Sequence, residues 1–309
     1  MSAMEPVKMS PTRLCTVLAL GGIVLFAAAL LSCGKSGPPR SPGEVLAVRR
    51  AAVPADPAAP EWRKAPLHTA ALLLQDMVEP RLMTASTRTV EVQAITDGAR
   101  IAFRIAWTDS SANDLPGASR FSDGCAVQLP AAIAADLPAP QMGEAGRPVE
   151  IAYWRASWQA VVDGRPDSIG ALYPGAAVDH YPFQAPTLAA GSPEQAAMTA
   201  RYAPARALGN PMAGPRARPV EDLVANGPGS LSPAGETRSD GRGVRTKTGW
   251  AVVISRPLPA GLAAAGRTQA AFAVWEGGRE EVGARKMRTG WVPLAIEATA
   301  GAVAKKAGH

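Results

Sequence analysis

The sequence predicts an all-β fold, a sandwich of two mostly antiparallel sheets with short helices in loop insertions. Glycine and proline occur 30 and 29 times among 309 residues and are spread along the chain, which favours strands and loops over a helical bundle. Short apolar runs also alternate with turn signals. The clearest case is the pair Thr89–Ile95 and Ala99–Trp107, which flanks Asp97-Gly98, a dipeptide typical of β-hairpins.

The second strand of this hairpin predicts which side faces the core. Successive side chains of a strand point to opposite faces, so Ile101, Phe103, Ile105 and Trp107 share one face. Small and charged residues occupy the other face. We therefore expect the aromatic and branched side chains to pack between the two sheets.

The first 32 residues have the order of an export signal. Lys8 and Arg13 precede an uncharged run, Leu14–Leu31, and the run closes in Leu30–Cys33. This closing tetrapeptide resembles the bacterial lipobox, which implies that Cys33 becomes an acylated N-terminus. The alternatives are an uncleaved membrane anchor and a plain secreted protein. All three place the body of the protein on the periplasmic side of a bacterial membrane or in its extracytoplasmic space.

Composition divides the rest of the chain into three parts. Residues 33–60 are rich in Pro and Ala without periodicity, which predicts a tether that holds the domain away from the membrane. Residues 61–297 contain the alternating apolar runs and predict one β-sandwich domain. Residues 298–309 predict a flexible tail.

Further strands follow from short apolar runs bounded by turns. A strand-like piece occurs at Arg81–Met83, and Arg155–Val162 either continues a strand or starts the next one. The better-defined strands are Cys125–Leu129, Val149–Trp154, Trp250–Leu258, the run through Phe272 and Val274, and Trp291–Glu297.

Residues 163–249 predict a long insertion between strands, of the kind that usually carries recognition. Ser192–Arg201 begins Ser-Pro-Glu-Gln, a capping-box arrangement with Pro at the first helical position, and predicts a short helix. Val220–Asn226 and Gly241–Gly249 fit turns and brief helical pieces.

Charge and cysteine content exclude several classes of protein. The formal net charge is +6 without a run of Lys and Arg, so no nucleic-acid partner is predicted. Cys15 and Cys33 lie in the leader region, which leaves Cys125 as a small buried apolar residue of its strand. The sequence has no C-x-x-C-H for covalent haem, no cysteine cluster for iron–sulfur and no structural zinc pattern.

No catalytic motif stands in the strand–helix context that its chemistry requires. Asp109 and Asp123 could form a pair of carboxylates, but aspartate in a turn ordinarily accepts backbone hydrogen bonds. The chain is therefore not expected to be an enzyme.

Two distant stretches carry a resemblance to a known family. In Pro140–Trp154, Met142 stands in a loop before Gly143, and a strand follows. In Ala270–Glu297, a polar loop between two strands carries Lys286. Together with shorter segments in the same order over residues 61–297, these stretches resemble the haem-binding gamma subunit of the ethylbenzene dehydrogenase and dimethylsulfide dehydrogenase type of molybdenum enzyme.

The resemblance implies one non-covalent b-type haem (heme b) whose iron is held between Met142 and Lys286. It also implies a subunit that passes single electrons between the iron–sulfur subunit of an extracytoplasmic molybdenum oxidoreductase and a cytochrome or quinone-linked partner. The thioether is a soft neutral ligand, and the amine must lose its proton to bind. Arg285 and Arg288 beside the lysine are candidates to pair with the haem propionates.

Other donors and other functions stay open on the sequence alone. Met287 and Met212 are competing thioethers, and His68 with His180 would form a bis-histidine site. A different class of function is a non-haem envelope lipoprotein that binds carbohydrate by stacking on Trp154, Trp158 and Trp275. A third is an assembly factor for a molybdenum enzyme complex, which would carry no haem.

Overall fold

A computed structural model describes residues 43–166, 169–175, 188–189, 191–208, 210 and 216–298. The predicted leader with Cys33, most of the predicted tail, His180 and Met212 lie outside the described residues. Within the described ranges, no helix is both long and apolar enough to cross a membrane.

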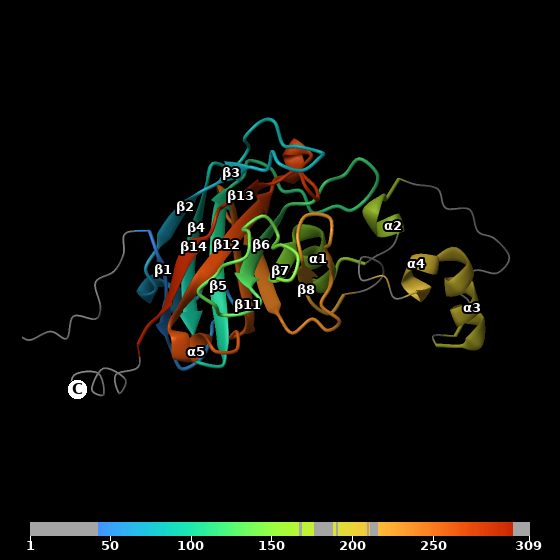
Figure 1. The fold of residues 1–309 in the computed structure, drawn as a ribbon. Coiled ribbons are helices and arrows are strands. Elements are labelled where there is room, and N and C mark those ends of the chain that lie inside the picture. The colour runs from blue at the N-terminus through green and yellow to red at the C-terminus, as the bar shows by residue number, and fades with distance from the viewer. Residues whose placement is uncertain are drawn as a thin grey trace, which may run out of the picture. The chain divides into compact units, whose positions relative to one another are not determined.

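The fold is mostly β, as predicted, and its strands form two layers (Figure 1). Layer A runs in the order β10-β11-β5-β4-β1-β14, with β2 also paired to β4. Its strands are β1 (Val45–Arg49), β2 (His68–Ala71), β4 (Thr89–Thr96), β5 (Arg100–Thr108), β10 (Asp240–Arg245), β11 (Gly249–Pro257) and β14 (Val292–Ile296).

Layer B runs in the order β12-β6-β7-β8-β9, with β13 paired to β12 and β3 paired to β13. Its strands are β3 (Leu73–Leu74), β6 (Gly124–Pro130), β7 (Val149–Arg155), β8 (Val220–Ala225), β9 (Ser232–Pro233), β12 (Arg267–Trp275) and β13 (Met287–Arg288). The short helices are η1 (Pro60–Lys64), α1 (Ala156–Val162), α2 (Ile169–Leu172), α3 (Pro193–Tyr202), α4 (Pro204–Ala207), α5 (Leu262–Ala265) and η3 (Gly277–Arg279).

Strand β12 joins the two layers into one hydrogen-bonded network of 14 strands. Its first residues, from Arg267 to Ala270, pair with β14 of layer A. Its last residues, from Ala271 to Trp275, pair with β6 of layer B. The two predicted sheets are therefore continuous through one strand that changes partner half-way along.

The main core lies between the layers. Phe103 of β5 meets Phe272 of β12 edge to face, with ring centroids 6.0 Å apart. Trp154 of β7 packs in the same way against Trp107 and Trp250 of layer A. All five side chains belong to one buried apolar cluster, whose removal from water is the main favourable contribution to folding.

The hairpin predicted around Asp97-Gly98 is present as β4 and β5. Asp97 Oδ1 accepts hydrogen bonds from the N–H groups of Ala99 and Arg100, and these bonds lower the pKa of the carboxyl group. Gly98 has φ +95°, a conformation that glycine adopts without steric cost. The predicted core face is also confirmed, because the four large residues of β5 on that face are buried.

The predicted tether is wrong for part of its range. Val45–Arg49 forms β1, which pairs parallel to β4 on one side and to β14 on the other. Val45 and Ala47 are fully buried. The strand escaped prediction because it is only 5 residues long and its neighbours in the sheet are distant in sequence. The folded domain therefore begins before residue 61.

Four local predictions need correction, three of them in the insertion or beside it and one at residues 81–83. Val220–Ala225 is strand β8 paired with β7, although apolar residues at 220, 223 and 224 have helix-like spacing. Asp240–Arg245 is edge strand β10, and Ala156–Val162 is helix α1 where a strand was expected. Residues 81–83 are not in a strand. For β8, β10 and α1, pairing with, or packing on, a distant element outweighs the local pattern.

The predicted helix of the insertion is present as α3. Ser192 Oγ accepts a hydrogen bond from the N–H of Gln195 at 3.1 Å, which satisfies one of the unpaired donors at the start of the helix. Pro193 occupies the first helical position, as predicted.

Candidate haem site

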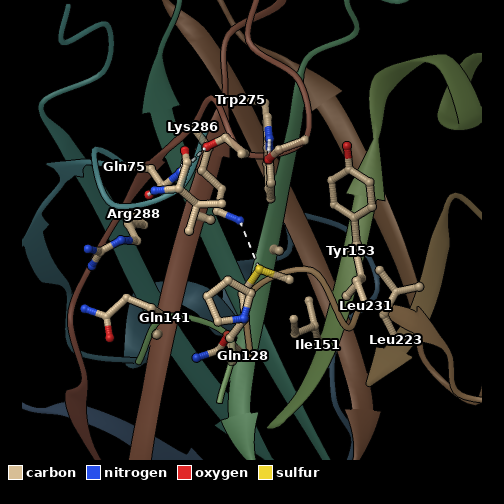
Figure 2. Close-up of a pocket in the computed structure, with 18 of the residues that line it drawn as sticks. Gln75, Gln128, Gln141, Ile151, Tyr153, Leu223, Leu231, Trp275, Lys286 and Arg288 are labelled. Atoms are coloured by element: carbon tan, nitrogen blue, oxygen red, sulfur yellow. Dashed lines mark hydrogen bonds between the residues drawn. The ribbon is translucent and has the colours of Figure 1, made fainter. Parts of the chain in front are cut away.

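A cavity of about 710 Å³ lies on the face of layer B that points away from the core. The strands β6, β7, β8 and β12 form one wall, and the loops around Gln75, Met142, Leu231 and Lys286 surround it (Figure 2). The lining is mostly apolar, and the volume falls in the range of pockets that hold cofactors.

The cavity exists because layer B is apolar on both faces. In β6, Cys125 and Val127 point into the core while Ala126 lines the cavity. In β12, Val274 points into the core while Ala273 lines the cavity. Small alanine side chains on the outer face leave room in front of the sheet.

The loop that carries Met142 is held in an unusual conformation. Met142 has φ +69°, which is uncommon for a residue other than glycine and costs about 1–3 kcal/mol. Its carbonyl accepts a hydrogen bond from Gly227 N–H at 2.8 Å. Gly143 follows with φ +76°, and a Cβ there would lie 2.9 Å from the Arg147 carbonyl oxygen and 3.0 Å from that of Ala225. The surrounding backbone therefore imposes this turn, and the turn aims the thioether into the cavity.

Lys286 lies in the loop between η3 and β13 and lines the cavity. Its carbonyl accepts a hydrogen bond from Gln75 N–H at 3.2 Å, and the Gln75 side chain holds the carbonyl of Ala284. Trp275 Nε1 donates to the carbonyl of Gly283 at 3.1 Å. The Lys286 amine lies 5.2 Å from the centroid of the same tryptophan ring.

The structure brings Met142 and Lys286 together across 144 residues of sequence, with Lys286 Nζ 3.8 Å from Met142 Sδ (dashed line in Figure 2). Two donors on opposite sides of one metal ion would be about 4.4 Å apart, if their bonds are as long as those in zinc sites. The distance between Lys286 Nζ and Met142 Sδ is therefore about 0.6 Å shorter than that spacing.

The electrostatics of the cavity disfavour the ammonium form of Lys286, so this amine loses its proton more easily than a lysine in water. Burial, with a smaller contribution from the positive charge of Arg288, lowers the pKa of Lys286 from 10.5 to about 8. None of the acidic side chains that line the cavity forms an ion pair with this amine. A neutral amine and a thioether are donors for a transition metal.

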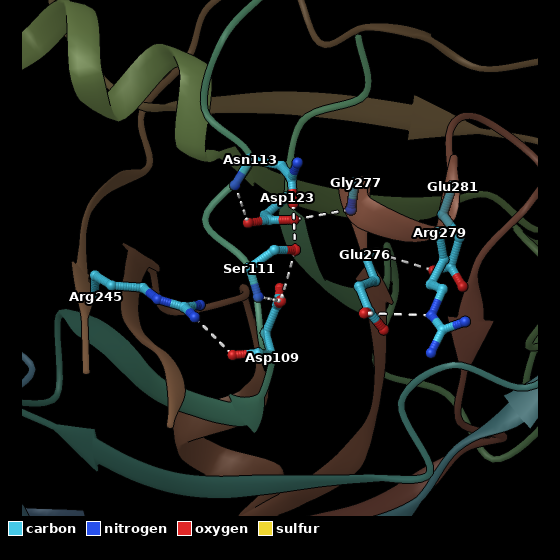
Figure 3. Close-up of polar contacts among 9 residues, drawn as sticks. All are labelled: Asp109, Ser111, Asn113, Asp123, Arg245, Glu276, Gly277, Arg279 and Glu281. Carbon is cyan, nitrogen blue, oxygen red and sulfur yellow. Dashed lines mark hydrogen bonds and ion pairs between the residues drawn. The ribbon is translucent and has the colours of Figure 1, made fainter. Parts of the chain in front are cut away.

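An aspartate fixes the start of the Lys286 loop (Figure 3). Asp123 is fully buried, and its carboxylate accepts hydrogen bonds from Asn113 N–H, Gly277 N–H and Trp250 Nε1 at 2.8–2.9 Å. Burial raises its pKa to about 6, and the nearby negative charge of Asp109 contributes to the rise. Asp109 accepts from Ser111 N–H. Asp109 thus accepts within its own turn, as predicted, whereas Asp123 bonds to segments that are distant in sequence.

Two arginines line the cavity, and one of them was predicted. Arg288 and Arg155 both have a buried Nε without a hydrogen-bond partner in the described structure. Arg285, the other predicted candidate, lies 5.7 Å from the ring centroid of Phe121 and does not line the cavity. Arg155 was missed because it ends β7 far from Lys286 in sequence.

The competing donors do not reach the cavity where they are described. Met287 is buried in the main core on the far side of layer B. His68 begins β2 in layer A and is not among the lining residues. Trp154, one of three predicted stacking groups, is also in the main core, whereas Trp158 and Trp275 do line the cavity. Across the residues described, no group of three or more His, Cys, Asp or Glu is suited to a metal ion.

The donor set therefore fits a haem. The cavity offers a soft sulfur and a nitrogen that face each other, apolar walls for a flat ring, and guanidinium groups whose Nε atoms lack partners. The role of Met142 and Lys286 as ligands remains a prediction.

Comparisons with known proteins identify relatives. The family model described as ethylbenzene dehydrogenase matches residues 59–192, a range that includes Met142 and ends before Lys286. A putative respiratory nitrate reductase heme subunit of Haloferax mediterranei is 24% identical, over 77% of this chain and 67% of the relative. The gamma subunit of chlorate reductase from Ideonella dechloratans is 27% identical, over 74% and 73%.

Among solved structures, a family 9 carbohydrate-binding module from Caldicellulosiruptor kristjanssonii, in complex with cellotriose, is similar with a TM-score of 0.37 and 8% identity. The match covers 83% of this chain and 94% of the module. A likeness at this level carries no information on function.

Proposed function

Because this chain is a relative of the haem-binding gamma subunits of molybdenum oxidoreductases, we propose that it holds one b-type haem non-covalently between Met142 and Lys286. Like those relatives, it is a non-catalytic electron-transfer subunit of an oxidoreductase complex. When bound, the haem iron supplies one-electron redox chemistry.

One observation supports the ligand pair above the others. A thioether and an amine from segments 144 residues apart lie 3.8 Å from each other in a mostly apolar cavity. An exposed lysine would have no reason to approach a sulfur atom, because water solvates an ammonium group better than a thioether does. The strained φ of Met142 supports the same conclusion, since such strain is common at functional sites.

The residues of the chain would divide the work of the site. Lys286 gives up its proton from Nζ more easily than a lysine in water does, because burial disfavours the ammonium form. Met142 presents a neutral sulfur, which favours the reduced state and raises the potential. Trp275 and the alanines of layer B exclude water from the ring. Arg155 and Arg288 provide positive charge for the haem carboxylates.

As a subunit, the chain requires catalytic partners, and we assign it a relay role. It would carry electrons between the iron–sulfur subunit that accompanies the molybdenum subunit and an external cytochrome or quinone-linked partner. The predicted export signal supports a position outside the cytoplasm, and the lipobox-like end of this signal supports a lipid anchor at Cys33.

Reconstitution of the purified full chain with haem b tests the ligand pair. We expect a low-spin six-coordinate b-type spectrum that is altered in Met142→Ala and in Lys286→Ala. Met83→Ala and Lys247→Ala remove exposed residues of the same types and should leave the spectrum unchanged. A full chain that takes up no haem, or a spectrum insensitive to both site substitutions, would contradict the proposal.

A further inference from the structure

Gln75 connects two loops at the edge of the cavity through both its backbone and its side chain (Figure 2). Its Nε2 donates hydrogen bonds to the carbonyls of Val78 at 3.0 Å and Ala284 at 3.1 Å. Its Oε1 accepts from the N–H groups of Met77 and Val78. Its backbone N–H donates to Lys286 and its carbonyl accepts from Leu82.

This glutamine uses the full capacity of its amide. A glutamine side chain has two N–H donors and two acceptor lone pairs, and all four are engaged here. The residue is 6% exposed, so water does not replace a bond that is lost. An unmade bond at this position would leave a carbonyl unsatisfied.

The bonds of Gln75 restrain the segment that carries the Lys286 amine. They hold the carbonyls of Ala284 and Lys286 itself, on either side of Arg285. Strand β13 begins directly after Lys286 and pairs with β3, which ends at Leu74 directly before Gln75. The backbone N–H of Gln75 therefore extends this short ladder to the Lys286 carbonyl, and its side-chain amide adds a bond to the carbonyl of Ala284.

We propose that Gln75 is the positioning residue of the site: its side-chain amide holds the carbonyl of Ala284, two residues before Lys286, and so fixes the lysine loop where the amine faces the Met142 sulfur. This inference rests on the proposed haem function and adds to it a residue that touches neither ligand atom. Its acceptor oxygen shapes the 75–78 turn, and its donor nitrogen ties that turn to the lysine loop.

The test uses the full chain reconstituted with haem b. Gln75→Glu keeps an acceptor oxygen and the side-chain length but removes both donors. We expect haem to dissociate about tenfold faster than from the wild type, measured by transfer to an excess of a haem-scavenging apoprotein. We also expect the absorption spectrum to shift toward that of Lys286→Ala. If Gln75→Glu does not fold, Gln75→Met removes the same donors without adding a charge.

Gln93→Glu is the matched control. Gln93 is 9% exposed in layer A, and its Nε2 donates to two backbone carbonyls, those of Trp62 and Ala65. This variant tests whether the loss of a buried side-chain amide donor far from the cavity also changes the haem spectrum. We expect the Gln93→Glu spectrum to match the wild type even where its melting temperature falls.

A double substitution separates positioning from general stability. In the Lys286→Ala background, Gln75→Glu should change the haem dissociation rate by less than about twofold, because the amine it positions is gone. Equal effects of Gln75→Glu with and without the lysine overturn the inference, as does a wild-type spectrum in Gln75→Glu. A wild type that binds no haem refutes the proposed function itself, which distinguishes the two failures.

Discussion

Replacing Lys286 by methionine should stabilise the protein without haem while removing the amine donor. At neutral pH the buried amine is an ammonium group in a mostly apolar cavity, which opposes folding. Methionine has a similar length, carries no charge and suits an apolar wall. The haem-free variant would then be more stable than the haem-free wild type but would bind haem more weakly. Such a loss of function with a gain of stability is expected when a functional residue is replaced.

The magnitude follows from the pKa of Lys286, which burial lowers from 10.5 to about 8. At about 1.4 kcal/mol per pKa unit, the difference corresponds to roughly 3 kcal/mol of unfavourable free energy at pH 7. The contact of the ammonium with the Trp275 ring, at 5.2 Å from its centroid, offsets on the order of 0.5–1 kcal/mol. We therefore expect Lys286→Met to raise the free energy of unfolding by about 2 kcal/mol.

The sign of the pH dependence is fixed by the same shift. Because the folded pKa lies below the unfolded value, the cost of burying the charge is fully present below pH 8. This cost disappears as the pH rises from about 8 to about 10.5, because Lys286 of the folded protein loses its proton in this range before the unfolded chain does. The advantage of Lys286→Met should fall by about half or more between pH 7 and pH 9.5.

Urea unfolding of the haem-free full chain, followed by tryptophan fluorescence at both pH values, measures this difference. Lys247→Met is the control, since Lys247 is an exposed lysine and its replacement should change the free energy of unfolding by less than about 0.5 kcal/mol. A Lys286→Met protein that is less stable than the wild type at pH 7 would refute the reasoning. So would an advantage that is the same at both pH values.

Three further predictions concern the ligand turn, its support and the N-terminal strand. Gly143→Ala places a Cβ 2.9 Å from the Arg147 carbonyl oxygen on a backbone with φ +76°. It should lower the free energy of unfolding, measured by urea titration, by about 1–3 kcal/mol. An unchanged urea midpoint of unfolding would contradict the geometry. Gln128→Glu removes the donor that bonds the Pro140 carbonyl at 3.0 Å, two residues before Met142. It should shift the haem midpoint potential while Met142 still binds the iron. A potential equal to that of the wild type would show that this hydrogen bond does not support the Met142 turn. Ala47→Asp buries a charge in β1 and should cost about 3–5 kcal/mol in a thermal melt, whereas a wild-type melting temperature would show that residues 45–49 are outside the fold.

Prediction from the sequence succeeded where the local pattern and the tertiary environment agree. The β4–β5 hairpin follows from alternation around Asp97-Gly98 because a turn and two flanking strands are adjacent in sequence. Met142 and Lys286 were predicted as ligands by resemblance alone. The cavity that both residues line could not be derived from spacing, because it depends on the register of β6, β7 and β12.

Other features were missed because their cause is not local. Strand β1 is defined by two parallel neighbours, and β8 by its pairing with β7, so neither shows in a short window. One available signal was overlooked. Strand β7 carries apolar or aromatic side chains at both Tyr153 and Trp154, on opposite faces, which indicates a strand buried on both sides and hence a covered outer surface.

The ligand pair is tested most directly by near-infrared magnetic circular dichroism of the ferric, haem-reconstituted full chain, because the energy of the charge-transfer band identifies the axial ligands. We predict one low-spin species with the band of a thioether–amine pair, lost in both Met142→Ala and Lys286→Ala. A band of a bis-histidine haem, or a protein without porphyrin, would contradict the account.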